Sequence, residues 1–277
     1  MRWTSRGRSR DLEDRRGQSG LRRAAPIGIG GALILLILTL LTGQDFLSLA
    51  DPGSGTLDTT TAQPHTPAPG EETLVDFVSF VLDDSQDVWT GLLGSRYQRA
   101  RLVLFTDAVE SACGFAQSAT GPFYCPGDHR VYIDLGFYRE LQQRFGAPGD
   151  FAQAYVLAHE IGHHVQTITG TEGEVRRVQR ADPSAANQLS VRMELQADCY
   201  AGVWAHTTSR RDMLDADDID EAMNAAAAIG DDRIQRMGGG RVAPERFTHG
   251  SSAQRMEWFR RGFDTGRPEA CNTFANR

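Results

Sequence analysis

Two histidines and a glutamate at residues 159–163 are the side chains of this chain best suited to metal chemistry. The stretch HEIGH places His159 and His163 four positions apart, with Glu160 directly after the first histidine. On a helix, residues four apart lie one turn from each other on the same face, so the two imidazoles can bind one ion. A glutamate beside such a pair serves as the general base in zinc peptidases. We therefore predict a Zn²⁺ site, one per chain, with Glu160 as the catalytic base.

The residues around HEIGH predict the helix that this chemistry requires. Asp150, with Gln153 three positions later, forms a start that resembles a capping box, and Gly170 suits the position after the last turn. Between these limits apolar residues recur at spacings of three and four, namely Phe151, Ala154, Ala158, Ile161, Val165 and Ile168. The adjacent His164 is interpreted as a solvated or hydrogen-bonded side chain rather than a ligand.

A catalytic zinc ion usually has three protein ligands, so a third is expected downstream. The extended pattern HExxHxxGxxH is excluded, because Gln166 and Thr169 occupy the positions of its glycine and its last histidine. Residues 182–206 predict a second helix, since they open with aspartate followed by proline. This helix contains ELQAD, which places Glu194 and Asp198 one turn apart.

The two acids of ELQAD suggest different roles. Glu194 is the expected third ligand, and Asp198 is expected to accept the other ring N–H of a ligand histidine, which fixes the tautomer of that histidine. The alternative is an ordinary acidic helix face that pairs with surface arginines such as Arg192. Competing third ligands are Glu172 and Glu174, both expected in a solvated loop, and His206 and His249.

With these motifs the chain resembles the gluzincin group of metallopeptidases, and more closely the bacterial putative neutral zinc metallopeptidase family, whose members carry one N-terminal membrane span. The similarity extends over nearly the whole chain, through the stretches MRWTSRGRSRDLEDRRG, SACGFAQSATGPFYCPGDHRVYIDLGFY, AHEIGHHVQ, ELQADCYAGVW and THGSSAQRMEWFRRGFDTG. The resemblance implies zinc-dependent hydrolysis of peptide bonds and says little about the substrate.

The N-terminal region has the composition of a membrane anchor. Residues 1–23 carry eight arginines against three acidic residues, and residues 24–44 contain no charge over a length that can cross a bilayer as a helix. Arginines before a span predict a cytoplasmic N-terminus. The sequence SLA at residues 48–50 keeps open the alternative of a cleaved signal peptide. Residues 45–70 are rich in proline, glycine and threonine and are expected to form a flexible linker.

This organisation predicts a zinc metallopeptidase domain over residues 71–277, held outside the cytoplasm by a single-pass anchor in a bacterial cell membrane. The basic tail precedes a predicted span, so it does not indicate nucleic acid as a partner. The expected partners are a peptide or protein substrate and the lipid bilayer, the latter through residues 24–44.

The domain is expected to have an α+β fold, a mostly helical, zincin-like domain with a small β-sheet. Apolar residues between 75 and 93 predict an amphipathic helix that ends at Gly94. LVLFT at 102–106 predicts a buried strand, and residues 121–135 predict two short strands joined by a PGDH turn. This hairpin either binds the substrate backbone, by analogy with other zinc peptidases, or only completes the sheet. Further helices are predicted at residues 217–230 and after a capping box of Ser251 and Gln254.

The four cysteines are even in number, which suits disulfides in an oxidising compartment. Cys113 and Cys125 flank a short loop and form the obvious local pair, which leaves Cys199 and Cys271 as the second pair. Four cysteines permit three connectivities, and proximity along the chain favours this one.

His249 stands just before the last predicted helix and is a candidate to stabilise the oxyanion of the transition state. A turn histidine satisfied by the backbone is the alternative, and Tyr132, Tyr138 or Tyr155 could share the task. For the domain as a whole, two functions besides catalysis stay open. It could be an inactive zinc-binding envelope module, or a scaffold or chaperone tethered to the membrane.

Overall fold

The computed structural model describes residues 1–17, 67–118, 121–239 and 241–275. The predicted membrane span at residues 24–44 and nearly all of the predicted linker lie outside the described residues. Within the described ranges, no helix combines the length and the apolar character that a membrane span requires.

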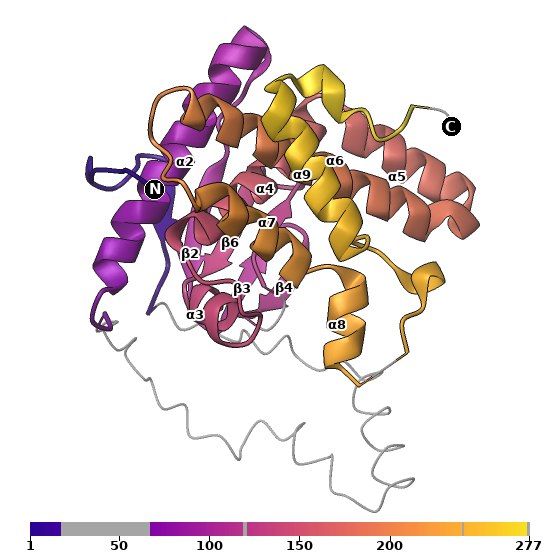
Figure 1. Ribbon diagram of the computed structural model, residues 1–277, viewed down its shortest axis with the longest axis horizontal. Helices are drawn as coiled ribbons and strands as arrows, with labels where there is room; N and C mark the ends of the chain where they lie inside the picture. The colour runs from indigo at the N-terminus through magenta and orange to yellow at the C-terminus, as the bar shows by residue number, and fades with distance from the viewer. Residues whose placement is uncertain (18–66, 119–120, 240, 276–277) are drawn as a thin grey trace, which may run out of the picture. The chain divides into compact units, whose positions relative to one another are not determined.

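The described fold is mostly helical, with small sheets, so the predicted α+β class is confirmed (Figure 1). Its longer helices are α2 (Glu71–Leu93), α4 (Asp150–Ile168), α5 (Thr171–Ala181), α6 (Ala186–Ser209), α7 (Asp218–Ala228) and α9 (Ser252–Thr265). The shorter helices are α3 (Gly136–Gln143) and α8 (Asp231–Met237), and 3₁₀ turns occur at Gly94–Arg96, Pro183–Ala185, Pro244–Arg246 and Pro268–Cys271.

Four strands form a mixed sheet in the order β1 (Leu12–Asp14), β2 (Arg101–Phe105), β6 (Arg130–Asp134) and β5 (Phe123–Cys125). Strands β1 and β6 run parallel to β2, whereas β5 runs antiparallel to β6. The predicted buried strand and the predicted hairpin are both present. A separate antiparallel pair, β3 (Ala108–Ser111) and β4 (Gly114–Gln117), was not predicted because these short, largely exposed strands lack an apolar run.

The first sixteen residues belong to the same compact unit as residues 67–277, whereas the sequence predicted a separate tail and a domain that begins at residue 71. Leu12–Asp14 pair with Leu102–Leu104 as an edge strand. The composition was misleading because its arginines form ion pairs within the fold. Arg16, for example, contacts the carboxylates of Asp14, Glu71 and Glu72.

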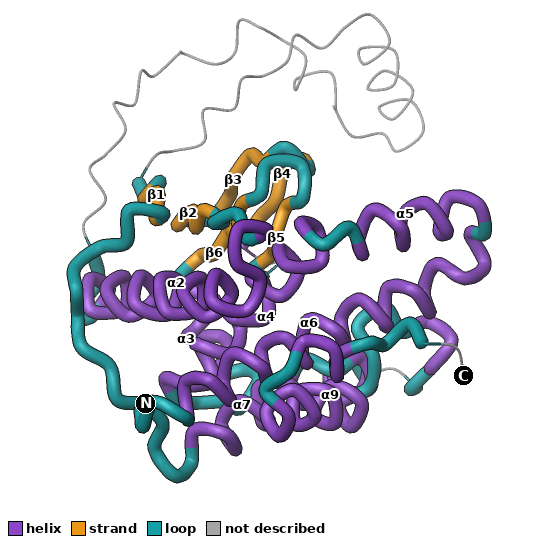
Figure 2. Tube along the Cα trace, turned by 90° about the horizontal axis from the view of Figure 1, so that it is seen from above, coloured by secondary structure: helices purple, strands orange, loops and turns teal. Residues whose placement is uncertain are grey.

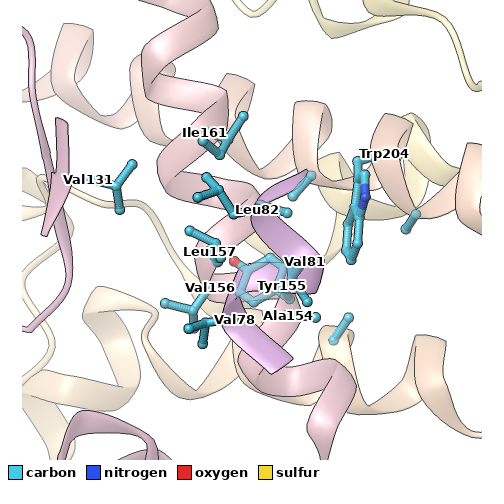
Figure 3. Packing of buried hydrophobic residues seen from close by; sticks show 14 of the residues in the cluster. Val78, Val81, Leu82, Val131, Ala154, Tyr155, Val156, Leu157, Ile161 and Trp204 are labelled. Carbon is cyan, nitrogen blue, oxygen red and sulfur yellow. The ribbon is translucent and has the colours of Figure 1, made fainter. Parts of the chain in front are cut away.

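Helix α4, which carries HEIGH, lies between the four-stranded sheet and a layer that contains α6 and α7 (Figure 2). Its apolar side chains are buried against neighbours from several elements. Figure 3 shows Leu157 and Ile161 beside Leu82 of α2, with Val131 of β6 on the far side. Close packing on both sides holds this helix, and therefore its polar residues, in one position.

Glycines allow α4, α6 and α9 to approach closely. A Cβ atom at Gly162 of α4 would lie 3.0 Å from the carbonyl oxygen of Ala197 in α6. At Gly262 of α9 it would lie 1.9 Å from the carbonyl oxygen of Cys199 in α6, so only glycine fits there. These contacts set the spacing between the helices that carry the candidate ligands.

Two local expectations differ from the structure. Helix α4 is not capped by Asp150: Gly149 is its N-cap residue, and the Glu221 carboxylate of α7 accepts the backbone N–H of Phe151 at 3.0 Å. A tertiary contact thus replaces the expected capping box. The expected solvated loop after Gly170 is helix α5, whose Glu172 and Glu174 pair with arginines of the same helix.

Candidate metal centre

Helices α4 and α6 bring the three predicted ligands together. An oxygen of Glu194 lies 3.2 Å from Nε2 of His159, and its other oxygen lies 3.4 Å from Nε2 of His163. All three ligand atoms lie within 4.8 Å of one another. Two ligands about 2.1 Å from one tetrahedral zinc ion are separated by about 3.4 Å. The donor set and its spacing therefore fit zinc.

Charge is concentrated at this site. Burial raises the pKa of the Glu194 carboxyl, but His163 and His159 outweigh burial and hold the pKa well below its usual range. Burial lowers the pKa of His159, whereas Asp198 and Glu194 together raise it to about 10. Without a metal, a proton on the imidazoles would supply the positive charge that faces the Glu194 carboxylate. A metal ion must displace it, as metal binding to histidine generally does.

Each ligand histidine has a hydrogen-bond partner for its other ring nitrogen. Nδ1–H of His159 donates to Oδ1 of Asp198 at 2.8 Å, and Nδ1–H of His163 donates to Oε1 of Gln166 at 2.8 Å. Both bonds turn Nε2 of each ring toward Glu194, so that a metal ion which displaces the proton there meets the tautomer a metal ligand needs. The contact between Asp198 and His159 agrees with the prediction from the sequence, whereas the contact between Gln166 and His163 was not predicted.

The Asp198 carboxylate is itself held by two residues whose contacts with it were not predicted from the sequence. It accepts two hydrogen bonds from Arg255 of α9, at 2.8 and 2.9 Å, and a short one from the hydroxyl of Tyr155. Burial raises the pKa of Asp198, but Arg255 and His159 bring it below its ordinary value. Arg255 could have been found from its spacing, since it shares the buried face of α9 with Phe259 and Gly262.

A second chain of hydrogen bonds joins His163 to the C-terminal disulfide. The amide nitrogen of Gln166 donates to Oε1 of Gln196 at 3.1 Å, and that of Gln196 donates to the carbonyl of Cys271 at 3.0 Å. Cys271 is bonded to Cys199 of α6. The predicted pairing of Cys199 with Cys271, and of Cys113 with Cys125, is confirmed.

The metal centre opens into a cleft of about 720 Å³. Glu160 lines this cleft together with the three candidate ligands, as the adjacent position on α4 predicts. Much of the remaining wall is apolar or aromatic and includes Phe123, Tyr124, Phe137, Phe145, Val156, Ile229 and Ile234. A carboxylate, three candidate metal ligands and apolar walls thus line one cleft, the combination expected of a binding or catalytic site.

The profile of the family described as "Putative neutral zinc metallopeptidase" matches residues 1–274. This chain belongs to that family. It is 46% identical over 284 residues to the "Uncharacterized protein YpfJ" of Escherichia coli strain K12, which covers 99% of each chain. It is 47% identical over 199 residues to the "Uncharacterized protein Rv2575" of Mycobacterium tuberculosis strain H37Rv, covering 68% of this chain and 66% of that protein. No solved structure matches the chain.

In this family member His249 also lines the cleft, in the loop before α9. Its Nδ1 lies 3.2 Å from Oδ1 of Asp231, the first residue of α8. The other oxygen of Asp231 accepts the backbone N–H groups of Thr248, His249 and Gly250. Asp231 therefore fixes the loop and holds the imidazole by Nδ1, which leaves Nε2 for another partner. Nothing local in the sequence predicts this contact across 18 positions.

The other candidates lie elsewhere. Two of the tyrosines considered for the oxyanion donate their hydroxyl protons to carboxylates, Tyr155 to Asp198 and Tyr132 to Asp128. The third, Tyr138, is buried and is not among the residues that line the cleft. His206 lies outside the ligand cluster and donates from Nδ1 to the carbonyl of Phe263. His164 is buried between the hydroxyl of Tyr124 and the carbonyl of Gln98, which fits a hydrogen-bonded side chain rather than a solvated one.

Proposed function

We propose that this chain is a zinc-dependent peptidase that hydrolyses peptide bonds of a peptide or protein substrate. The observation that carries the proposal is the position of the Glu194 carboxylate between the Nε2 atoms of His159 and His163, at 3.2 and 3.4 Å, in a cleft that Glu160 also lines. A zinc ion held by these three residues would polarise the scissile carbonyl and lower the pKa of a water molecule to about 7.

Side chains of the cleft provide proton transfer, stabilisation of the oxyanion and positioning of the ligands. Glu160 takes a proton from the attacking water and then gives it to the leaving amine, as a general base and acid. His249 donates a hydrogen bond from Nε2 to the oxyanion that develops on the carbonyl. Asp231 positions this imidazole, because it accepts the backbone N–H of His249 and pairs with its Nδ1. Asp198 and Gln166 hold the two ligand histidines in their required tautomers.

Strand β5 is the proposed support for the substrate backbone. Among the described strands it pairs only with β6, so its other edge has no strand partner. Its Phe123 and Tyr124 line the cleft, and β5 contacts helix α4. An extended peptide that adds to this edge would cross the cleft with its backbone hydrogen-bonded to β5. This arrangement favours the substrate-binding role of the hairpin over a purely structural one.

The proposed location is outside the cytoplasm, with attachment to the membrane through residues 24–44. Two disulfides support an oxidising compartment. The uncharged length of residues 24–44 supports contact with a bilayer.

The test combines metal analysis of the purified full chain with profiling of cleaved peptides from an unfolded protein substrate. We expect about one zinc ion per chain and cleavage that a chelator abolishes and added zinc restores. Bound zinc without cleavage would instead favour the inactive zinc-binding module. A chain that binds no zinc would favour the scaffold or chaperone and remove the proposal.

A further inference from the structure

The first sixteen residues are bound to the metallopeptidase domain over most of their length. The hydroxyl of Ser5 donates to Asp76 at 2.8 Å and that of Ser9 to Asp83 at 2.7 Å, both on helix α2. The carboxylate of Asp11 accepts from Arg99 at 2.6 Å. Side chains from three successive parts of the segment thus contact the domain directly.

The same segment completes the sheet. Leu12, Glu13 and Asp14 pair in register with Leu102, Val103 and Leu104 of β2. The backbone N–H of Leu102 donates to the carbonyl of Asp11, and that of Arg15 donates to the carbonyl of Leu104, each at 2.8 Å. Without β1, the buried strand β2 would present an unpaired edge, which is costly for its backbone groups.

The two described segments that flank residues 18–66 meet at one place. The guanidinium of Arg16, with a side chain only 3% exposed, lies 2.6 Å from a Glu71 oxygen and 3.0 Å from a Glu72 oxygen at the start of α2. It also contacts Asp14 at 2.6 Å. A buried cation with three carboxylate partners is a specific contact, because removing its partners would leave an unpaired buried charge. The chain therefore leaves the domain and returns to it at neighbouring points.

We propose that residues 1–16 and the metallopeptidase domain lie on the same side of the membrane, so residues 24–44 do not carry the chain across it as a single span. Strand pairing and ion pairs of 2.6 Å cannot form across a hydrocarbon layer about 30 Å thick. The positive-inside argument also weakens, because Arg2, Arg8, Arg15 and Arg16 are paired with carboxylates of the fold. Any insertion of residues 24–44 into a bilayer starts and ends on the domain's side. This inference does not depend on catalysis.

Cysteine labelling in cells tests the proposal directly. Thr4→Cys and Ser95→Cys place one thiol each at exposed positions of the segment and of the domain, and the four native cysteines of the full chain are paired in disulfides. Bacteria that express each variant are treated with a membrane-impermeant maleimide, before and after the cytoplasmic membrane is permeabilised. The chain without an added cysteine gives the background, and labelling after denaturation confirms that each thiol reacts.

We expect both thiols to react before permeabilisation, since the domain is proposed to lie outside the cytoplasm. If both reacted only after permeabilisation, the shared side would hold and the proposed location would be wrong. One thiol reacting only before and the other only after would overturn the proposal and restore the single span. A second measurement addresses docking itself in the purified full chain. Arg16→Ala is expected to lower the midpoint of thermal unfolding by several degrees. Arg10→Ala, at an exposed arginine with no hydrogen bond or ion pair to the described residues, should leave it unchanged. Equal midpoints would contradict docking of the segment.

Discussion

Arg255 of helix α9 holds Asp198 of helix α6 by two hydrogen bonds, from Nε at 2.8 Å and from Nη2 at 2.9 Å, and both side chains are almost completely buried. Asp198 in turn accepts Nδ1–H of His159. The guanidinium is therefore separated from the proposed metal by two residues, Asp198 and His159, and its Nη2 also lies 4.0 Å from an oxygen of Glu194. It compensates the negative charge of Asp198 and fixes the direction of its oxygens, so the orientation of His159 depends on α9 as well as on its own helix.

This relationship predicts that Arg255→Lys weakens zinc binding although the charge is retained. A lysine cannot donate the paired hydrogen bonds of a planar guanidinium, so Asp198 would lose its fixed orientation. We expect zinc affinity to fall by roughly 10- to 100-fold, the range typical for residues that support a ligand. Chelator competition measures this affinity. Arg260→Lys, at an exposed position of the same helix, is the matched control, and equal affinities in the two variants would contradict the role of Arg255.

Glu160 and His163 should separate catalysis from metal binding. Glu160→Gln removes the proton acceptor and leaves the three candidate ligands intact, so the protein should keep its zinc and its fold but lose peptidase activity. His163→Ala removes one of three ligands and should lose the metal. Zinc content and peptide cleavage are measured on both variants. Stoichiometric zinc in His163→Ala would refute the ligand assignment.

The contact between Asp231 and His249 predicts a pH dependence. The hydrogen bond to Asp231 outweighs burial and raises the pKa of His249 above its ordinary value of 6.5. Protonated His249 donates most strongly, so kcat/KM should fall as the pH rises through this raised pKa. The pair's contribution to folding stability should likewise be complete below about pH 6.5 and be lost as the pH rises through the raised pKa.

Asp231→Asn tests this dependence. The variant removes the charge that raises the pKa of His249, so the alkaline limb of the kcat/KM profile should move to lower pH. Asp220→Asn, at an exposed position of α7, should leave the profile unchanged. An alkaline limb that stays in place in Asp231→Asn would show that another group sets it.

The sequence was informative where a contact is encoded by short spacing. His159 and His163 lie one helical turn apart, as do Glu194 and Asp198, and the capping box at Ser251 is present as predicted. Long-range contacts carry no such signal. Arg255 reaches Asp198 across 57 positions, and Glu221 caps α4 across 70.

Elements with little buried surface were also missed. Helix α5 buries only Val175 among its eleven residues, so it has no apolar stripe by which a helix is predicted. Strand β1 has three residues of intermediate exposure, two of them acidic, and its pairing with β2 depends on a partner about 90 positions away. Its arginine-rich surroundings indicated a tail, because charge composition does not show whether the charges are paired.

The disulfide between Cys199 and Cys271 is expected to support the metal site through Gln196 and Gln166. Replacing both cysteines by serine removes the bond that holds residue 271 against helix α6. The carbonyl of residue 271 accepts Nε2–H of Gln196 at 3.0 Å, so Gln196 would be held less firmly. Gln196 in turn accepts a hydrogen bond from Gln166. His163 would then lose part of its support, because its Nδ1–H donates to Gln166. We expect zinc affinity to fall roughly 10-fold.

The matched control for this prediction is the pair Cys113→Ser and Cys125→Ser. The two disulfides close loops with sequence separations of 72 and 12 residues. Loop entropy alone predicts losses of about 4 and about 3 kcal/mol in the free energy of unfolding, so both variants should be less stable, the Cys199/Cys271 variant somewhat more so. Only the Cys199/Cys271 variant should also bind zinc more weakly, because among the described residues only that bridge is joined to His163 by hydrogen bonds. Equal zinc affinities in two folded variants would show that the glutamine chain does not transmit the effect.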